Sequence, residues 1–116
     1  MLGIHNLQPQ SQDYRRAFEY FIAMELRAYL SYYRKQEPLS YWCSKQGQEV
    51  DFIIGDHTAI EVKSTSSVTS KHLNGLKVLQ EENICKKYYL ISFDKVNRNV
   101  DSIEIMYWRD FLLILR

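Results

Sequence analysis

Three charged side chains on two short neighbouring segments have the residue types needed to hydrolyse a phosphodiester. Asp51 lies in EVDFII (49–54), and Glu61 and Lys63 lie in TAIEVK (58–63). A hard divalent ion such as Mg²⁺ binds one or two carboxylates, several waters and a substrate phosphate oxygen. A lysine beside the ion can hold a phosphate or a developing charge. Asp51, Glu61 and Lys63 are therefore candidates for a site of metal-assisted phosphodiester hydrolysis.

A β-hairpin would bring these residues together. Both segments are rich in β-branched and aromatic residues, and Gly-Asp-His (55–57) separates them, which is typical of two strands and a tight turn. A three-residue turn over 55–57 would place Asp51 opposite Glu61, and Glu49 opposite Lys63. A two- or four-residue turn without a bulge would put the polar residues of the two strands on opposite faces. The hydrophobic pattern therefore favours the three-residue turn, with Ile54 opposite Thr58.

Alternation along the first strand decides which way its carboxylates point. Side chains two positions apart share a strand face, so Glu49 and Asp51 should point together and Val50, Phe52 and Ile54 the other way. The same arrangement also suits an ordinary amphipathic ribbon, whose charges form cross-strand ion pairs on a solvated face. Two carboxylates that close would repel each other unless a cation lay between them. The residues by themselves leave the metal site and the charged ribbon both open.

A long helix should precede the hairpin. From about Asp13 to Lys35 there is no Gly or Pro, and apolar residues recur at helical spacing: Ile22, Ala23, Leu26, Leu30 and Tyr33. Glu19 projects near the middle of this stripe, where an unpaired carboxylate is costly. Either Glu19 pairs with Arg15 one turn earlier, or the helix packs on the sheet and delivers Glu19 to the metal.

The remaining segments complete an α/β pattern. The expected elements are strands over 39–44, 86–93 and 102–107, a helix over 71–82 capped by Ser70, a polar connection over 94–100, and a short helix over 108–115. Leu73, Leu76 and Leu79 form the buried stripe of the middle helix, which Gly75 weakens slightly. Lys71 and His72 follow soon after Lys63 and could contact phosphate, but a solvated first turn is the favoured interpretation. The order is α-β-β-β-α-β-β-α, and its strand-helix-strand unit predicts a mixed sheet with helices on both faces.

Length and composition bound the class of protein. At 116 residues, 46% hydrophobic and 25% charged, the chain is typical of one soluble globular domain, here 13–116 after an irregular lead-in over 1–12. A net charge of +1 neither indicates nor excludes a nucleic acid as binding partner. No apolar run approaches the about 20 residues that a membrane-spanning helix needs.

Cysteine and histidine usage indicates no structural metal site. Cys43 and Cys85 are far apart in the sequence and lack the spacing of metal ligands. We therefore expect both to be small buried hydrophobic side chains, and the protein to be reduced and cytoplasmic. His5, His57 and His72 are too scattered for a zinc site.

Four blocks along the chain resemble a known family. AFEYFIAMELRAYL, LSYW, EVDFII and IEVK, in this order and at this spacing, resemble the nuclease-like domain of unknown function (family 4143) at the C-terminus of many prokaryotic AAA-family ATPases. Asp51 followed by Glu61-Val62-Lys63 also resembles the motif of the PD-(D/E)XK nuclease superfamily. The likeness runs from about Asp13 to the last residue.

The resemblance implies a restriction-endonuclease-like fold and a role for each candidate residue. Asp51 and Glu61 would be metal ligands, Lys63 the catalytic lysine and Glu19 a helical ligand, with Mg²⁺ or Mn²⁺ as cofactor and DNA as substrate. The chain departs from the family pattern at two places, and the second would weaken substrate binding if the usual arginine contacts phosphate. Arg15-Arg16 stands where the family usually has a glycine, and Cys43 stands where an arginine is common.

Two functions follow as hypotheses. The first is a magnesium-dependent endonuclease or deoxyribonuclease acting through Asp51, Glu61, Lys63 and Glu19. The second is a non-catalytic module that binds nucleic acid or protein and derives from the C-terminus of an AAA-family ATPase, because such folds can lose their chemistry. The chain has no GxxxxGK[ST] phosphate loop, so we expect no nucleotide-hydrolysing module in it. The oligomeric state stays open, with a homodimer among the alternatives.

Overall fold

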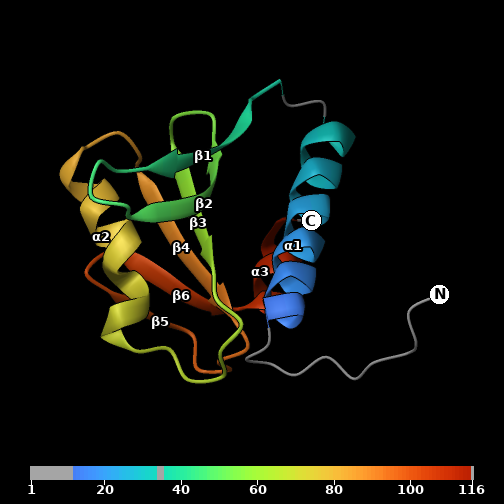
Figure 1. Cartoon of the computed structure of the whole chain (residues 1–116). Helices are drawn as coiled ribbons and strands as arrows, with labels where there is room; N and C mark the ends of the chain where they lie inside the picture. Colours follow the sequence, from blue (N-terminus) through green and yellow to red (C-terminus); the bar gives the residue numbers. More distant parts are fainter. Residues whose placement is uncertain (1–11, 34–35, 116) are drawn as a thin grey trace.

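The computed structural model describes residues 12–33 and 36–115 of the chain. Its elements are α1 (Gln12–Tyr32), β1 (Leu39–Cys43), β2 (Glu49–Ile54), β3 (Thr58–Val62), the 3₁₀ helix η1 (Ser70–Leu73), α2 (Asn74–Glu81), β4 (Lys87–Ser92), β5 (Arg98–Val100), β6 (Ile103–Tyr107) and α3 (Trp108–Leu115). The sheet lies between α2 on one face and α1 with α3 on the other (Figure 1). The predicted α/β fold with helices on both faces is confirmed. The lead-in over 1–11 lies outside the described residues.

The six strands form one mixed sheet in the order β1-β2-β3-β4-β6-β5. β1, β2 and β3 are antiparallel neighbours, β3, β4 and β6 run parallel, and β5 is antiparallel to β6. Ile54 pairs with Thr58, which confirms the three-residue turn. The chain crosses from β3 through η1 and α2 to the parallel strand β4, as the strand-helix-strand pattern predicts. β3 is therefore a central strand, and all five of its residues are buried.

The long N-terminal helix packs against one face of the sheet. The residues of α1 that become buried recur every four positions: Phe18, Ile22, Leu26 and Leu30. They form one cluster with sheet residues such as Ile60 and Ile91 and with Phe111 of α3. Ala23 is only half-buried, and the prediction that Tyr33 belongs to the stripe is wrong because Tyr33 lies beyond the last helical residue and is 47% exposed.

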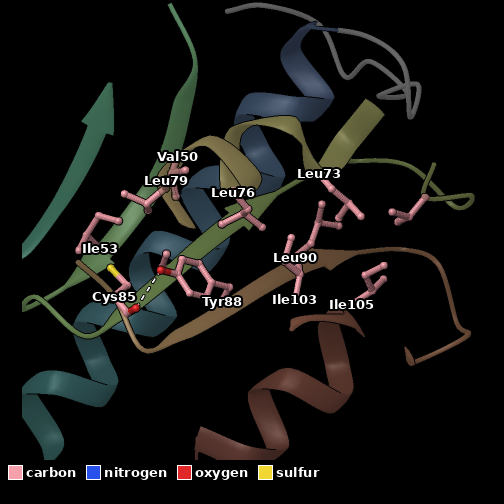
Figure 2. Packing of buried hydrophobic residues seen from close by; sticks show 12 residues of the cluster. Val50, Ile53, Leu73, Leu76, Leu79, Cys85, Tyr88, Leu90, Ile103 and Ile105 are labelled. Carbon is pink, nitrogen blue, oxygen red and sulfur yellow. Dashed lines mark hydrogen bonds between the residues drawn. The ribbon is translucent and has the colours of Figure 1, made fainter. Parts of the chain in front are cut away.

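The second cluster fills the space between α2 and the other face of the sheet. The predicted stripe of Leu73, Leu76 and Leu79 is confirmed, since each side chain is at most 2% exposed. Figure 2 shows these leucines above Leu90 and Ile103 of the sheet. At the edge of this cluster the Tyr88 hydroxyl donates to the Cys85 carbonyl at 2.8 Å.

Three local predictions are corrected. The middle helix begins with η1, and its N-cap is Thr69 rather than Ser70, because the backbone of Thr69 is extended while Ser70 is already helical. The polar connection over 94–100 contains strand β5, which pairs with the edge of β6 and adds a strand to the predicted order. Cys85 is buried as expected, but Cys43 is exposed because it ends the edge strand β1.

A bulge interrupts the alternation of β2. Ser40 of β1 pairs with Ile53 and Trp42 pairs with Val50, so the single residue Tyr41 faces both Asp51 and Phe52. Two residues opposite one is a β-bulge, which bends the strand and re-aims its side chains. Val50 and Ile53 consequently both pack on the α2 side of the sheet. The prediction of strict alternation over 49–54 is therefore wrong. Val50 and Phe52, which were expected on one face, lie on opposite faces of the sheet because the bulge at Asp51 and Phe52 separates them.

Asp94 anchors the loop that follows β3. Its carboxylate accepts the backbone N–H groups of Val68 at 2.9 Å and Val96 at 3.0 Å, and Arg98 Nη1 lies 3.2 Å away. These hydrogen bonds, above all the one from Val68, lower the pKa of Asp94. The stability that they contribute is present above the ordinary pKa of 3.8 and is lost as the pH falls through the lowered value.

Asp94→Asn is expected to lower the free energy of unfolding at pH 7 by roughly 1–2 kcal/mol, because the amide keeps one acceptor oxygen but loses the charge and the second acceptor. Urea unfolding at pH 7 and at pH 3 measures the effect. The difference between variant and wild type should shrink at pH 3, and an equal difference at both values would contradict the charged role of Asp94.

None of the helices in the described part of the chain is both long and apolar enough to cross a membrane.

Candidate functional site

Asp51 and Glu61 meet where β2 and β3 diverge. The backbone pairing of the two strands runs from the turn to Phe52 and Ile60. Beyond it the Asp51 N–H donates to Glu61 Oε1 at 3.2 Å, and the Val62 N–H donates to Asp51 Oδ2 at 2.8 Å. Each carboxyl group thus takes a backbone donor of the opposite strand. This reciprocal contact confirms that the hairpin places Asp51 beside Glu61.

Glu61 is buried to an unusual degree for a carboxyl group. The residue is only 5% exposed, because it lies on a central strand beneath α2. Burial, and then the adjacent carboxyl of Asp51, raise the pKa of Glu61 from 4.5 to about 9. The alternative of an ordinary ribbon with a solvated charged face is therefore wrong for Glu61.

Lys63 provides the positive charge beside this pair. Its Nζ lies 3.7 Å from Glu61 Oε2, and its side chain is 40% exposed. The predicted surface pair between Glu49 and Lys63 does not form in the described part of the protein. Lys63 instead pairs with Glu61 and remains accessible to a ligand.

Two clefts open beside the carboxyl pair, both at Asp51 and the second also at Glu61. One of about 390 Å³ lies beside α1 and is lined by Arg15, Glu19, Asp51, Val62, Lys63, Ser64, Thr65 and His72. Another of about 300 Å³ lies beside the start of α2 and also has Glu49, Glu61, Lys71 and Gly75 in its wall. Asp51, Lys63 and His72 line both. A more apolar cavity of about 340 Å³ around Tyr29, His57 and Phe111 contains none of the predicted site residues.

Glu19 lies in the wall of the first cleft with Asp51, as expected if α1 delivers it to the site. Desolvation, and then the charge of Asp51, raise the pKa of Glu19. The alternative ion pair with Arg15 does not form between these two described residues, although both line the same cleft.

The donor set fits a hard divalent ion that keeps most of its water. Within residues 12–33 and 36–115, no three His, Cys, Asp or Glu side chains are gathered closely enough to form a complete ligand cluster. Asp51 and Glu61 nevertheless supply two adjoining carboxyl groups, and Mg²⁺ is commonly held by one or two carboxylates with waters and phosphate oxygens. The pKa of Glu61 stays high although Lys63 is near, because the charge of Lys63 offsets burial and the Asp51 carboxyl only in part. Oxygen ligands of this kind suit Mg²⁺ or Mn²⁺ rather than a thiophilic metal.

Comparison with known protein families agrees with the four blocks seen in the sequence. Residues 15–111 match the model of a domain of unknown function, DUF4143. The chain belongs to the DUF4143 family. No curated protein and no solved structure matches it. The matched range includes Glu19, Asp51, Glu61 and Lys63, so every predicted site residue lies within the DUF4143 domain.

Gly75 is a part of the candidate site that the sequence did not indicate. It lies in α2, and a Cβ at this position would be 2.4 Å from the Glu49 carbonyl oxygen and 3.5 Å from Glu61 Oε2. Only a residue without a side chain lets α2 approach the diverging strands so closely. The available signal was a glycine beside the buried stripe of a helix, at a position where alanine would favour the helix more.

His72 is the second residue that the sequence underestimated. It is half-buried rather than solvated, and it lines both clefts. Its Nδ1 accepts the N–H of the N-cap residue Thr69 at 2.9 Å, so the His72 side chain takes part in a capping box at the start of η1. Desolvation, and then the charge of Lys63, lower the pKa of His72. The ring is consequently a fixed, neutral group beside Lys63 at pH 7.

Proposed function

We propose that this DUF4143 domain is a divalent-metal-dependent nuclease that hydrolyses phosphodiester bonds of DNA. The observation that carries the proposal is the reciprocal contact of Asp51 and Glu61 at the divergence of β2 and β3, with Lys63 Nζ 3.7 Å from Glu61. The resemblance of Asp51 and Glu61-Val62-Lys63 to the PD-(D/E)XK motif supports the same chemistry.

Each residue has a distinct role in this proposal. Asp51 and Glu61 would hold Mg²⁺ or Mn²⁺, and Glu19 would add a carboxylate from the opposite wall of the cleft. When bound, the ion would polarise the phosphoryl group and make a bound water more acidic. Glu61 must release its proton before it can serve as a ligand, so metal affinity should increase with pH. Lys63, which is charged and partly exposed, would hold a phosphate oxygen and stabilise the developing negative charge.

Asp51→Asn tests the metal site without removing the contact that Asp51 makes in the fold. The amide oxygen can still accept the Val62 N–H, so the variant should fold. Calorimetric titration with Mn²⁺ at pH 8 should show about one or two ions bound to the wild type. The variant should bind at least about 100-fold more weakly, because even outer-shell partners of a metal cost 10- to 100-fold in affinity.

The matched control is Asp56→Asn, which makes the same change of charge in the exposed turn at the other end of β2. Its Mn²⁺ affinity should equal that of the wild type. If the folded wild type binds no Mn²⁺ at millimolar concentration, or if Asp51→Asn binds it equally well, the proposed nuclease has no cofactor and the proposal fails.

An exposed apolar surface favours a second function, that of a binding module. Several large hydrophobic residues of α1 and α3 lie more than a third exposed: Tyr20, Phe21, Met24, Tyr32, Leu113 and Ile114. Groups of such residues on a surface often mark interaction sites. A domain that serves only for binding should lack Mn²⁺ affinity and keep its partner when Asp51 is replaced. The same titration therefore separates the two functions.

A further inference from the structure

The cleft beside α1 is lined by side chains of both charges. Glu19 and Asp51 contribute carboxyl groups, whereas Arg15, Lys63 and His72 contribute hydrogen-bond donors. The fold directs Arg15 from the first turns of α1 into this cleft. A cleft of about 390 Å³ with donors next to carboxyl groups can receive an anion and a cation together.

The ring of His72 is held in one tautomer by its own backbone. Nδ1 accepts the Thr69 N–H at 2.9 Å and lies 3.3 Å from Thr69 Oγ1. Because a backbone N–H can only donate, Nδ1 of the neutral ring must be the acceptor and Nε2 must carry the proton. In the described part of the chain, Nε2 of His72 has no hydrogen-bond partner. A fixed N–H donor is therefore available at a position that borders both clefts.

We propose that His72, Lys63 and Arg15 form a phosphate-binding subsite beside the carboxyl pair, in which His72 Nε2–H donates to a non-bridging oxygen of a phosphodiester. This inference rests on the proposed function, since it names the group that the cleft receives. The two non-bridging oxygens of a phosphodiester can accept hydrogen bonds from Lys63 and His72 together. Arg15, which is exposed at the rim of the cleft, then neutralises part of the negative charge of the nucleic-acid backbone. A neutral donor adds a hydrogen bond without repelling the neighbouring lysine or a metal ion.

Two substitutions separate the capping role of His72 from its binding role. His72→Asn places an amide oxygen near the position of Nδ1, so it can still accept the Thr69 N–H, but it has no donor at the position of Nε2. His72→Gln reaches the position of Nε2 with an amide N–H₂ and gives up the cap. Loss of a hydrogen bond to a charged group weakens binding by about tenfold or more.

The experiment measures fluorescence anisotropy of a short labelled DNA duplex in Ca²⁺, which permits binding without relying on turnover. His72→Asn should bind the duplex about tenfold more weakly than wild type, with an unchanged unfolding midpoint and an unchanged Mn²⁺ affinity. His72→Gln should bind within about threefold of wild type but unfold at a lower midpoint. Arg15→Gln should weaken binding and reduce its salt dependence. Competition by inorganic phosphate at concentrations equal to those of DNA phosphate would identify free phosphate as the ligand instead of a nucleic-acid strand.

The outcomes distinguish this inference from the proposed function. If wild type binds Mn²⁺ but does not bind the duplex, or if His72→Asn binds DNA like wild type, the subsite is overturned while the metal site stands. If His72→Asn and His72→Gln weaken binding equally and both lower the unfolding midpoint, His72 acts only through the cap and the subsite is overturned as well. If wild type binds the duplex but no Mn²⁺, and His72→Asn weakens that binding, the subsite stands and the nuclease fails.

Discussion

Glu61→Gln is expected to make the metal-free protein more stable than wild type at pH 8, by about 2–4 kcal/mol. Glu61 is 5% exposed, and its pKa is raised from 4.5 to about 9 by burial and by Asp51. Glutamine resembles the protonated acid in shape and is neutral at every pH. Its amide oxygen can still accept the Asp51 N–H, and its N–H₂ can donate to the Asp51 carboxylate.

The sign of this stability change follows from proton linkage. A carboxyl group with a raised pKa in the folded state contributes stability that is fully present below the unfolded pKa of 4.5. That contribution is lost as the pH rises through the window from 4.5 to about 9. Wild type should therefore lose stability from this group between pH 5 and pH 9, whereas Glu61→Gln should not.

Urea unfolding of both proteins in a chelating buffer, at several values between pH 5 and pH 9, measures this difference. Addition of Mn²⁺ should then stabilise wild type at pH 8 and leave Glu61→Gln nearly unchanged, because only a protein that binds the ion gains stability from it. Parallel stability curves for the two proteins across the whole range would show that Glu61 is not the buried acid described here.

Gly75→Ala is expected to destabilise the domain by about 2 kcal/mol or more, although alanine favours a helix by about 1 kcal/mol over glycine. The added Cβ would lie 2.4 Å from the Glu49 carbonyl oxygen, a backbone atom that cannot rotate away. Either α2 or β2 must shift, and the shift moves the wall of the cleft that contains Glu61. We therefore expect a weaker Mn²⁺ affinity together with a lower free energy of unfolding.

Glu81→Ala is the matched control, because it places the same residue at the exposed end of α2. Its stability should differ from wild type by about 0.5 kcal/mol or less. Urea unfolding and Mn²⁺ titration of the two variants provide the comparison. An alanine at position 75 that stabilises the protein, as helix propensity alone would predict, would show that α2 does not approach β2 as closely as the structure indicates.

The sequence by itself determined the local elements and four residues of the candidate site. Periodicity of two and the Gly-Asp-His break predict the hairpin and its three-residue turn, because both are set by side-chain alternation and turn length. The helical spacing of apolar residues predicts α1 and the leucine stripe of α2, because this spacing is also set by local geometry alone. The residue types at 51, 61 and 63 predict that the two strands of the hairpin form one site, whereas for Glu19 they leave an ion pair with Arg15 equally open. The structure brings side chains of α1, β2 and β3 to one cleft.

Only the tertiary structure decided how these residues are held. A local pattern does not state which face of a hairpin another element will cover, so the burial of Glu61 became visible only with β3 at the centre of the sheet and α2 above it. The bulge that re-aims Asp51 depends on the register with β1, which is a pairing between segments. Gly75 and His72 belong to the site because the crossover from β3 to β4 brings α2 back over the diverging strands, and contacts at such separation leave no periodic mark in the sequence.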